Sequence, residues 1–261
     1  MFVRSPLPKQ ISKEFSSLGI DIFFYESVDS TSDEARRYAE AASPVSPSLF
    51  VAKEQSTGRG RLGRSFFSPR DTGLYMTLLL PYGEYSFTHL TSLCAVVLRS
   101  SIKRVFGSET SIKWVNDLYL NGKKVSGILA QSFSVGERRF LALGIGVNIS
   151  TVAFPDELAD VACSLGHIGD SPEEQSAVNL ALAHEVCREL LEAFDATDTK
   201  KYMDEYRKHS YVIGKRISFF ENGVEYFGTA VDVTDDGELL VSTPDGIKTL
   251  SSGEISVRVK E

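Results

Sequence analysis

The sequence predicts an α+β protein: a mixed or antiparallel sheet with helices on one face, followed by a small C-terminal β-domain. Up to about residue 210, apolar runs typical of buried strands are interspersed with segments whose apolar residues recur at helical intervals. From Ile213 onward the pattern changes to short alternating runs, which are typical of small β-barrels or sandwiches. These runs are separated by the turn dipeptides Asn222-Gly223, Asp236-Gly237 and Asp245-Gly246.

In the first half of the chain, the residues before Ile20 are expected to form a loosely structured lead-in. Ser30 or Thr31 can cap a helix over residues 32–42, because short hydroxyl side chains accept bonds from the first free amides of a helix. Residues 89–106 also carry helical spacing. Strand-like runs cover residues 20–27, 49–54 and 73–81.

Residues 111–148 are expected to form a meander of three strands. Asn121-Gly122 predicts its first hairpin turn, and Val135 to Glu137 can form the second. Loop and a short helix are expected over 154–172, a long amphipathic helix over 172–194, and another helix over 200–209. The change of pattern predicts two domains, residues 1–210 and 211–261.

The composition is that of an ordinary globular protein, with 42% hydrophobic and 24% charged residues in 261. Because the net charge is −7, the overall field does not favour non-specific nucleic-acid binding. The three cysteines have no metal-like spacing and are expected to be reduced, buried thiols. No signal peptide or membrane span is recognisable, so we expect a soluble, cytoplasmic protein.

The segment Gln55 to Pro69 (QSTGRGRLGRSFFSP), called here the arginine-glycine loop, joins two predicted core strands. Glycine lets the backbone approach a ligand closely, and arginine binds carboxylate or phosphate oxygens with a planar fork. Interleaved, they predict a mobile loop that folds over a multiply charged anion. The alternatives are a solvated basic surface loop and an RGG-like nucleic-acid segment.

Two further clusters carry polar side chains suited to a ligand. Asp29-Ser30-Thr31-Ser32 lies at a strand-to-helix junction, where hydroxyls and a helix N-terminus can bind a polar group; simple helix capping is the alternative. Lys113 to Asp117 (KWVND), with Lys123 and Lys124 following, can bind phosphate, while Asp117 helps to hold Mg²⁺. The alternative is a salt-bridged, solvated strand edge.

Leu143 to Asn148 (LGIGVN) resembles half of a dinucleotide fingerprint but lacks the third glycine and the following helix. We interpret its glycines as room for a ligand against the strand, with Asn148 available to bond a base. No histidine falls in these clusters, and no nucleophile elbow, Walker loop or metal quartet is present. The pattern therefore favours catalysis by neutralising charge and aligning reactants.

In this order, the motifs resemble those of the biotin protein ligases, the biotin–[acetyl-CoA-carboxylase] ligases. The resemblance is strong over residues 25–148. The motifs are DSTS (29–32), GRGRLGR (58–64), FFSP (66–69), KWVNDLYL (113–120), KVSGIL (124–129) and GIGVN (144–148), and GEISVR near the C-terminus is also similar. The resemblance implies a catalytic domain like that of class II aminoacyl-tRNA synthetases and an SH3-like C-terminal barrel.

The family's reaction has two steps. Biotin and MgATP give biotinyl-5′-AMP and pyrophosphate, and biotin then passes to a lysine of a biotin carboxyl carrier protein, a subunit of acetyl-CoA carboxylase. Because carboxylate and α-phosphate are both negative, the cations of the motifs would reduce their repulsion. The resemblance implies these catalytic residues: Arg59, Arg61, Lys113 and Lys124.

Motif by motif, the resemblance also implies the binding residues. For biotin they are Ser30, Thr31, Ser32, Gln55, Arg59, Gly60, Arg61, Lys124, Gly127, Leu129, Gly144 and Gly146. For ATP they are Arg61, Arg64, Phe66, Lys113, Asn116, Asp117, Asn148 and Arg258, with Asp117 also implied for Mg²⁺.

Three positions depart from the family pattern. Ser32 stands where Asn or His is usual, Val115 where proline is usual, and Phe66 where tryptophan is common, which reduces the area for stacking on a purine. The residues before Ile20 are too few for the winged helix-turn-helix of bifunctional members, so we expect a ligase without specific DNA binding. A homodimer is among the expected assemblies.

Two other functions compete with this one. A lipoate–protein ligase or octanoyl transferase is a relative in fold, but such proteins generally lack this arginine-glycine loop. A non-catalytic binding protein would use the loop for a nucleotide or RNA. Adenylation of biotin rather than lipoate separates the first rival from the ligase, and biotin-dependent release of pyrophosphate separates the second.

Overall fold

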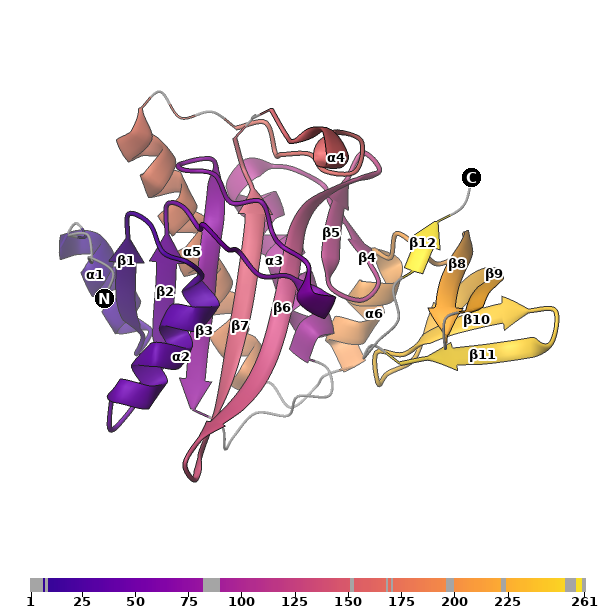
Figure 1. Cartoon of the computed structure of the whole chain (residues 1–261), viewed down its shortest axis with the longest axis horizontal. Coiled ribbons are helices and arrows are strands. Elements are labelled where there is room, and N and C mark those ends of the chain that lie inside the picture. Colours follow the sequence, from indigo (N-terminus) through magenta and orange to yellow (C-terminus); the bar gives the residue numbers. More distant parts are fainter. Residues whose placement is uncertain are drawn as a thin grey trace.

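The computed structural model describes most of the chain. The described residues are 7, 9–81, 90–150, 153–167, 169, 171–195, 200–221, 224–251 and 257–259. They form a seven-stranded sheet and a five-stranded sheet, with helices packed mainly on the larger one (Figure 1). The α+β prediction is confirmed.

The larger sheet has the strand order β1-β2-β3-β7-β6-β5-β4. Its strands are β1 (Asp21–Tyr25), β2 (Ser48–Ala52), β3 (Gly73–Pro81), β4 (Ser111–Lys113), β5 (Asp117–Leu120), β6 (Lys123–Val135) and β7 (Arg138–Asn148). Neighbouring strands are antiparallel except β1 and β2, which are parallel and are connected through helix α2 (Thr31–Ala41). The sheet is therefore mixed, as predicted.

The hairpin between β5 and β6 turns at Asn121 (φ 51°) and Gly122 (φ 80°), both left-handed as a tight two-residue hairpin turn requires. The turn at Gly136 (φ 59°) joins β6 to β7. The expected three-stranded meander gains a fourth strand, because Ser111–Lys113 pairs with β5 as β4.

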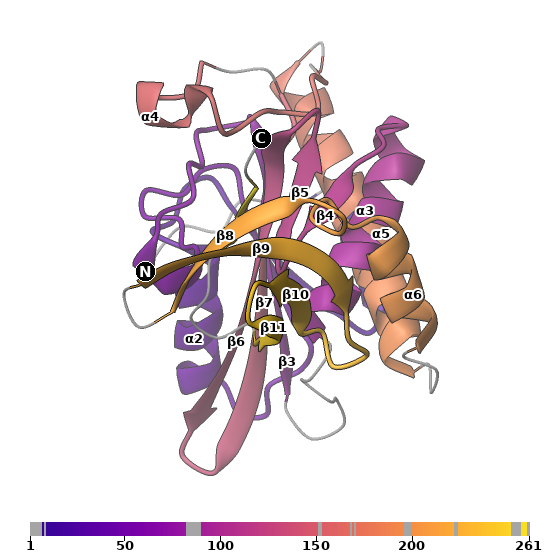
Figure 2. The ribbon, with the colours of Figure 1, turned by 90° about the vertical axis from the view of Figure 1, so that its right-hand side faces the viewer.

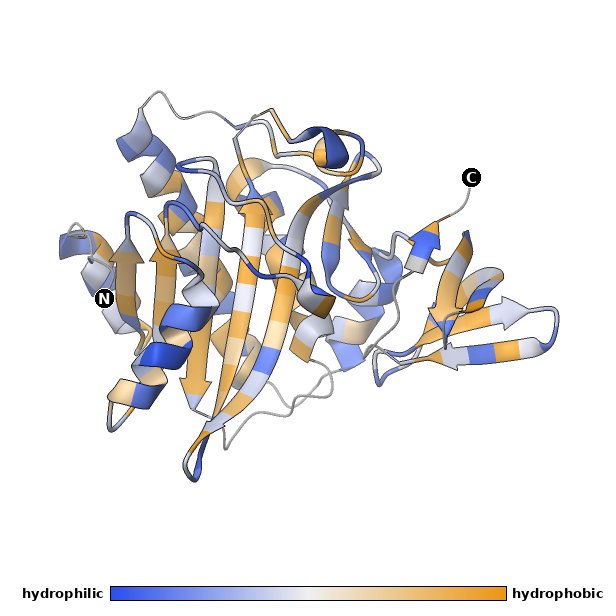
Figure 3. Cartoon of the chain, in the orientation of Figure 1, coloured by the Kyte–Doolittle hydropathy of each residue, from blue (hydrophilic) through white to orange (hydrophobic). Residues whose placement is uncertain are grey.

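Helices cover both faces of the larger sheet. Figure 2 shows α3 (Leu90–Phe106), α5 (Pro172–Asp195) and α6 (Lys200–Lys208) on one side and α2 on the other. The expectation of helices on one face holds for α3, α5 and α6 and is wrong for α2. Every residue of β2 and the first eight of β3 are buried, and Figure 3 shows both strands as largely hydrophobic. Such continuous burial is expected of strands covered on both faces, so α2 is a necessary second layer.

The residues before Ile20 were expected to form a loosely structured lead-in, and for those that the structure describes this is wrong. Helix α1 (Lys9–Ser17) buries Phe15 completely, and this ring meets His184 of α5 edge-to-face at 5.3 Å between centroids. The connection between β7 and α5 contains the short helix α4 (Asp156–Ala159), as predicted.

The smaller sheet has the order β11-β10-β9-β8-β12. Its strands are β8 (Arg216–Glu221), β9 (Val224–Val233), β10 (Leu239–Thr243), β11 (Gly246–Leu250) and β12 (Val257–Val259). In the described part of the chain this sheet is open, with β11 and β12 at its edges, rather than a closed barrel. Gly237 and Gly246 have positive φ at two predicted turns, whereas Asn222-Gly223 lies outside the described residues.

Two hydrogen bonds tie the segment that follows β4 to the smaller sheet and to α6, and a third joins α6 to the smaller sheet. Trp114 Nε1 donates to the carbonyl oxygen of Gly237 at 2.9 Å. The Tyr206 hydroxyl donates to the carbonyl oxygen of Val115 at 3.2 Å, and Arg207 Nε donates to that of Val233 at 2.6 Å. Trp114 and Val115 of the KWVND segment are thus held in place by hydrogen bonds to the smaller sheet and to α6.

Cys94 and Cys187 are buried free thiols, as expected, while Cys163 is free and half-buried. Burial raises the pKa of Cys187 to about 12, which makes this thiol unreactive. Within the described ranges, none of the helices has the length and apolar character needed to cross a membrane.

Candidate active site

A cavity of about 350 Å³ lies between the arginine-glycine loop and the larger sheet. Its walls come from α2, the loop, β3 to β7, and the segment around α4. The structure brings together most of the predicted site residues. Those lining the cavity are Ser30, Thr31, Ser32, Gln55, Arg59, Gly60, Arg61, Arg64, Phe66, Lys113, Asn116, Asp117, Lys124, Gly127, Leu129, Gly144 and Gly146.

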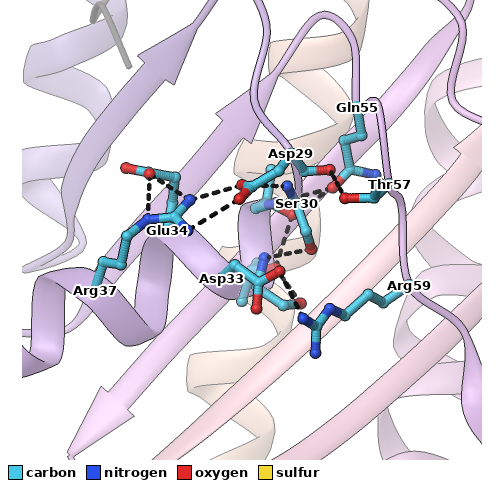
Figure 4. Close-up of polar contacts among 11 residues, drawn as sticks. Asp29, Ser30, Asp33, Glu34, Arg37, Gln55, Thr57 and Arg59 are labelled. Carbon is cyan, nitrogen blue, oxygen red and sulfur yellow. Dashed lines mark hydrogen bonds and ion pairs between the residues drawn. The ribbon is translucent and has the colours of Figure 1, made fainter. Parts of the chain in front are cut away.

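One end of the cavity is uncharged and polar. Ser30 is the N-cap of α2, and its side chain accepts a hydrogen bond from Ser32 N. The same serine is fully buried and lines the cavity, so capping and ligand binding are compatible roles for it. Gln55 Oε1 accepts bonds from Thr31 N at 2.9 Å and from Thr31 Oγ1 at 3.1 Å (Figure 4).

The arginine-glycine loop is hydrogen-bonded to itself. Phe66 N donates to Gly58 O at 2.8 Å, and Gly60 N donates to Arg64 O at 2.7 Å. The tip, Arg61–Gly63, is a single 3₁₀ turn. A Cβ at Gly58 would lie 2.6 Å from Phe66 O and 2.7 Å from Ser68 Oγ, so only glycine fits here.

The first arm of the loop is also tied to the start of α2. Thr57 N and Thr57 Oγ1 both donate to Asp29 O, at 2.9 and 3.1 Å. Arg59 forms an ion pair with Asp33 at 2.9 Å, so its guanidinium points toward α2 (Figure 4). Arg59 thus lines the cavity while its charge is paired with Asp33.

The other end of the cavity is cationic. Lys124 Nζ forms an ion pair with Asp117 Oδ1 at 2.6 Å, and Arg61 Nη1 donates to Asn116 Oδ1 at 3.2 Å. Gly127 leaves room for the ammonium group, since a Cβ there would lie 3.1 Å from Lys124 Nζ. Asp117 is surrounded by basic groups, so this end remains positive overall and suits an anionic ligand.

Burial leaves the cations at this end poorly solvated. Desolvation lowers the pKa of Arg61, while the charge of Asp117 opposes the shift. Desolvation likewise lowers the pKa of Lys113, whose Nζ donates to the Tyr119 hydroxyl at 2.9 Å. Because they are poorly solvated, these cations gain more from an anion that binds in the cavity than solvated cations would.

Glycines of β7 form the floor of the cavity. A Cβ at Gly146 would lie 2.5 to 2.9 Å from ring atoms of Phe66, so this ring rests directly on the strand. A Cβ at Gly144 would lie 3.1 Å from Ser32 Oγ. Both glycines therefore let α2 and the loop approach the sheet closely.

We expect Gly146→Ala to lift the loop from the sheet. The added methyl group must displace Phe66, and overpacking of this kind costs about 1–3 kcal/mol. Limited proteolysis with trypsin measures the effect, and cleavage after Arg61 or Arg64 should be roughly tenfold faster. Cleavage after Lys215, outside the loop, is the internal control; an unchanged rate at the loop would contradict this packing.

Two predicted residues lie beside the cavity and not in its lining. Asn148 is 8% exposed, and its Nδ2 donates to Cys163 O at 3.0 Å. Arg258 is exposed on β12, and its charge contributes to lowering the pKa of Lys113. Val115, at the family's proline position, is buried, and the Trp114–Val115 peptide bond is cis.

Several residues that line the cavity were not predicted from the sequence. Tyr119 lines the cavity two residues after Asp117, a spacing that places alternate strand residues on one face and could have revealed it. Leu158, Val161 and Ala162 also line it, held by backbone bonds of Lys124. No local pattern indicates such a long-range pairing. Among the described residues, no histidine lines the cavity and no group of three His, Cys, Asp or Glu side chains could hold a metal.

Comparison with known proteins agrees with this site. Residues 24–148 match the model of the biotin/lipoate A/B protein ligase family, and residues 212–258 match that of the biotin protein ligase C-terminal domain. The chain is 31% identical over 257 residues to the bifunctional ligase/repressor BirA of Bacillus spizizenii, covering 92% of this chain and 75% of that protein.

A second relative is the biotin–[acetyl-CoA-carboxylase] ligase of Paracoccus denitrificans, with 29% identity over 87% of this chain and 96% of that protein. Among solved structures, the Aquifex aeolicus biotin protein ligase in complex with biotin and ATP superposes with a TM-score of 0.77. It is 26% identical, over 92% of this chain and 99% of that one.

Proposed function

Because the chain belongs to the biotin protein ligase family, we propose that it activates biotin with ATP and transfers it to a protein. In the first step biotin and ATP give biotinyl-5′-AMP and pyrophosphate. In the second, a lysine of a biotin carboxyl carrier protein receives the biotinyl group, and AMP leaves.

The observation that carries this proposal is that one cavity combines uncharged polar side chains at the start of α2, Ser30 and Ser32, with the cations Arg61 and Lys124 on the loop and β6. Biotin likewise combines an uncharged polar group with a charged one, with a ureido ring at one end and a carboxylate at the other. The hydroxyls of Ser30 and Ser32 suit the ureido group, and Arg61 and Lys124 suit the carboxylate. A free fatty acid would leave the polar end without partners, which a buried site tolerates poorly.

The cationic end suits the chemistry of the first step. A carboxylate oxygen of biotin attacks the α-phosphorus of ATP, and the bond from that phosphorus to the β-phosphate oxygen breaks. Arg61, Lys113 and Lys124 offset the repulsion between the two anions and stabilise the charge that develops on the phosphate oxygens. The arginine-glycine loop limits the access of water, which would hydrolyse the mixed anhydride.

In the second step the uncharged amine of the carrier lysine attacks the acyl carbon, the bond from that carbon to the AMP oxygen breaks, and the nitrogen releases one proton to solvent as the amide forms. AMP is an anion when it leaves, so the same cations favour its departure. The carrier amine is itself the nucleophile, so no side-chain nucleophile is needed in this step.

We assign the remaining predicted roles on the same basis. Arg64, Phe66 and Asn116 line the cavity, which supports their proposed contacts with the nucleotide, and the effect of Arg258 on the pKa of Lys113 supports a place for Arg258 near it. Asn148 remains a proposed adenine contact, which requires its amide to exchange the bond to Cys163. We also propose catalytic and C-terminal domains of residues 1–210 and 211–261.

Asp117 fits a metal that arrives with ATP. It is a carboxylate in the cavity lining, next to Asn116, and Mg²⁺ is usually held by one or two carboxylates together with substrate phosphates. Mg²⁺ would neutralise phosphate charge. Asp117→Asn should raise the Mg²⁺ concentration needed for half-maximal adenylation by roughly tenfold.

The affinity of Asp117→Asn for biotin, measured by calorimetry without ATP, should change much less than its Mg²⁺ dependence. Asp21→Asn, on the outer strand β1, is the matched control. Equal losses in Mg²⁺ dependence and biotin affinity would instead assign Asp117 to the positioning of Lys124.

The test of the function is incubation with biotin, MgATP and a biotin carboxyl carrier domain, with the carrier mass measured over time. We expect a gain of one biotinyl group that requires ATP. Lipoate in place of biotin should give no modified carrier. Transfer of lipoate in preference to biotin, or binding of ATP without any pyrophosphate release, would overturn the proposal.

A further inference from the structure

Thr77 of β3 lies directly behind the polar end of the cavity. It is completely buried and does not line the cavity, so it can act on a ligand only through other residues. Its Oγ1 is 2.9 Å from Thr31 Oγ1 and 3.1 Å from Ser32 Oγ. Thr77 therefore links two hydroxyls that do line the cavity.

The direction of these hydrogen bonds follows from Gln55. Thr31 N is 2.9 Å from one terminal atom of this side chain, and a backbone amide can only donate, so that atom is the carbonyl oxygen. Thr31 Oγ1, 3.1 Å from the same oxygen, must then donate to it. The amide nitrogen of Gln55 consistently donates to Ser68 Oγ at 3.0 Å, which donates to Phe66 O at 3.0 Å.

A hydroxyl group has one proton, so the remaining directions are determined. The proton of Thr31 is used toward Gln55, and Thr77 must therefore donate to Thr31. The proton of Thr77 is then used, and Ser32 must donate to Thr77. Ser32 Oγ consequently directs its proton away from the cavity and offers only lone pairs to a ligand.

We propose that Thr77 is a specificity-determining positioning residue, which fixes Ser32 as a hydrogen-bond acceptor for an N–H group of the substrate. This inference rests on the proposed function and identifies the ureido N–H groups of biotin as the recognised feature. Ser30, which accepts the bond from Ser32 N, keeps a proton that it can donate to the neighbouring ureido carbonyl. Together they match the donor and acceptor pattern of a ureido ring.

The neighbouring strand leaves space for this contact. Thr77 pairs with Gly144 in the register of β3 and β7, and a Cβ at that glycine would lie 3.1 Å from Ser32 Oγ. Ser32 stands where Asn or His is usual in the family. Its short hydroxyl can still act purely as an acceptor toward a ligand, because the hydroxyl of Thr77 accepts its proton.

The test compares biotin with its cyclic-carbonate analogue, in which oxygen replaces both ureido nitrogens. Binding is measured by calorimetry without ATP. The wild-type protein should bind biotin roughly 30-fold more tightly, because the analogue places an oxygen against the lone pairs of Ser32. Equal affinity of the wild type for the two ligands would overturn the inference, whatever the behaviour of any variant.

Thr77→Val keeps the shape of the side chain and frees the proton of Ser32. Compared with the wild type, this variant should bind biotin about tenfold more weakly and the analogue equally well. Its preference for biotin over the analogue should therefore fall to about threefold. Thr77→Ser should restore the wild-type preference. In a Ser32→Ala background, Thr77→Val should change biotin affinity less than twofold, whereas an equal loss in both backgrounds would refute a role through Ser32.

Adenylation of biotin, assayed alongside, separates this inference from the proposed function. If adenylation is normal and the preference for biotin over the analogue is the same with and without the Thr77 hydroxyl, only the role of Thr77 is overturned. A protein that binds biotin with the predicted preference but does not adenylate it overturns only the ligase function. A wild-type protein that does not bind biotin overturns both.

Discussion

Arg61→Ala should reduce the rate of biotin adenylation by about 100-fold or more. Arg61 is the half-buried arginine at the tip of the arginine-glycine loop, and its guanidinium reaches across the cavity to Asn116. Burial partly desolvates this guanidinium, which lowers its pKa, and in the proposed function it contacts the carboxylate and the α-phosphate. A donor placed at developing charge in a dry site contributes more than a solvated one.

The rate is measured by biotin-dependent exchange of pyrophosphate into ATP. Arg70→Ala is the matched control, because Arg70 follows the loop directly but pairs with Glu26 on the surface and does not line the cavity. Removal of that surface pair should change the rate less than twofold. Adenylation by Arg61→Ala at near the wild-type rate would remove Arg61 from the proposed chemistry.

Lys124→Met should lower kcat/KM for biotin by roughly 30- to 100-fold. The substitution keeps most of the apolar stem but removes the ammonium group 2.6 Å from Asp117. The carboxylate then lies in the cavity without this partner and repels both substrates. Because the pair is partly exposed, solvent screening keeps the effect below that of a fully buried pair.

Lys123→Met provides the matched control for this variant. Lys123 precedes Lys124 in β6, but its Nζ donates to Ala159 O outside the cavity. Lys123→Met should retain activity within about twofold. Adding Asp117→Asn to Lys124→Met removes the repelling charge and should recover part of the biotin affinity. Equal losses from Lys123→Met and Lys124→Met would show that only general surface charge matters.

Features that depend on neighbouring residues were predictable from the sequence. The hairpin at Asn121-Gly122, the cap of α2 at Ser30 and the bounds of β3 are confirmed. For the glycines of LGIGVN, the sequence indicated only that something lies close to the strand: a ligand was expected, and the structure shows the Phe66 ring at Gly146 and Ser32 Oγ at Gly144. Such features are local because φ preference, capping and absence of a Cβ act within a few residues.

Features that depend on distant partners were not predictable. Helix α1 forms because Phe15 finds a site near α5, although its own sequence is strongly polar. Arg59 turns toward Asp33 because the start of α2 and the loop lie side by side. Thr77 matters because it lies under Thr31 and Ser32, more than forty positions earlier in the chain. A single sequence contains no signal for such pairings.

The most direct test of the central claim is a crystal structure with biotin and a non-hydrolysable ATP analogue. We predict the ureido ring beside Ser30 and Ser32, with the arginine-glycine loop closed so that Arg61 and Lys124 both lie within hydrogen-bond distance of the carboxylate or the α-phosphate. A structure in which both ligands are bound while the loop points into solvent and neither cation contacts them would contradict the account.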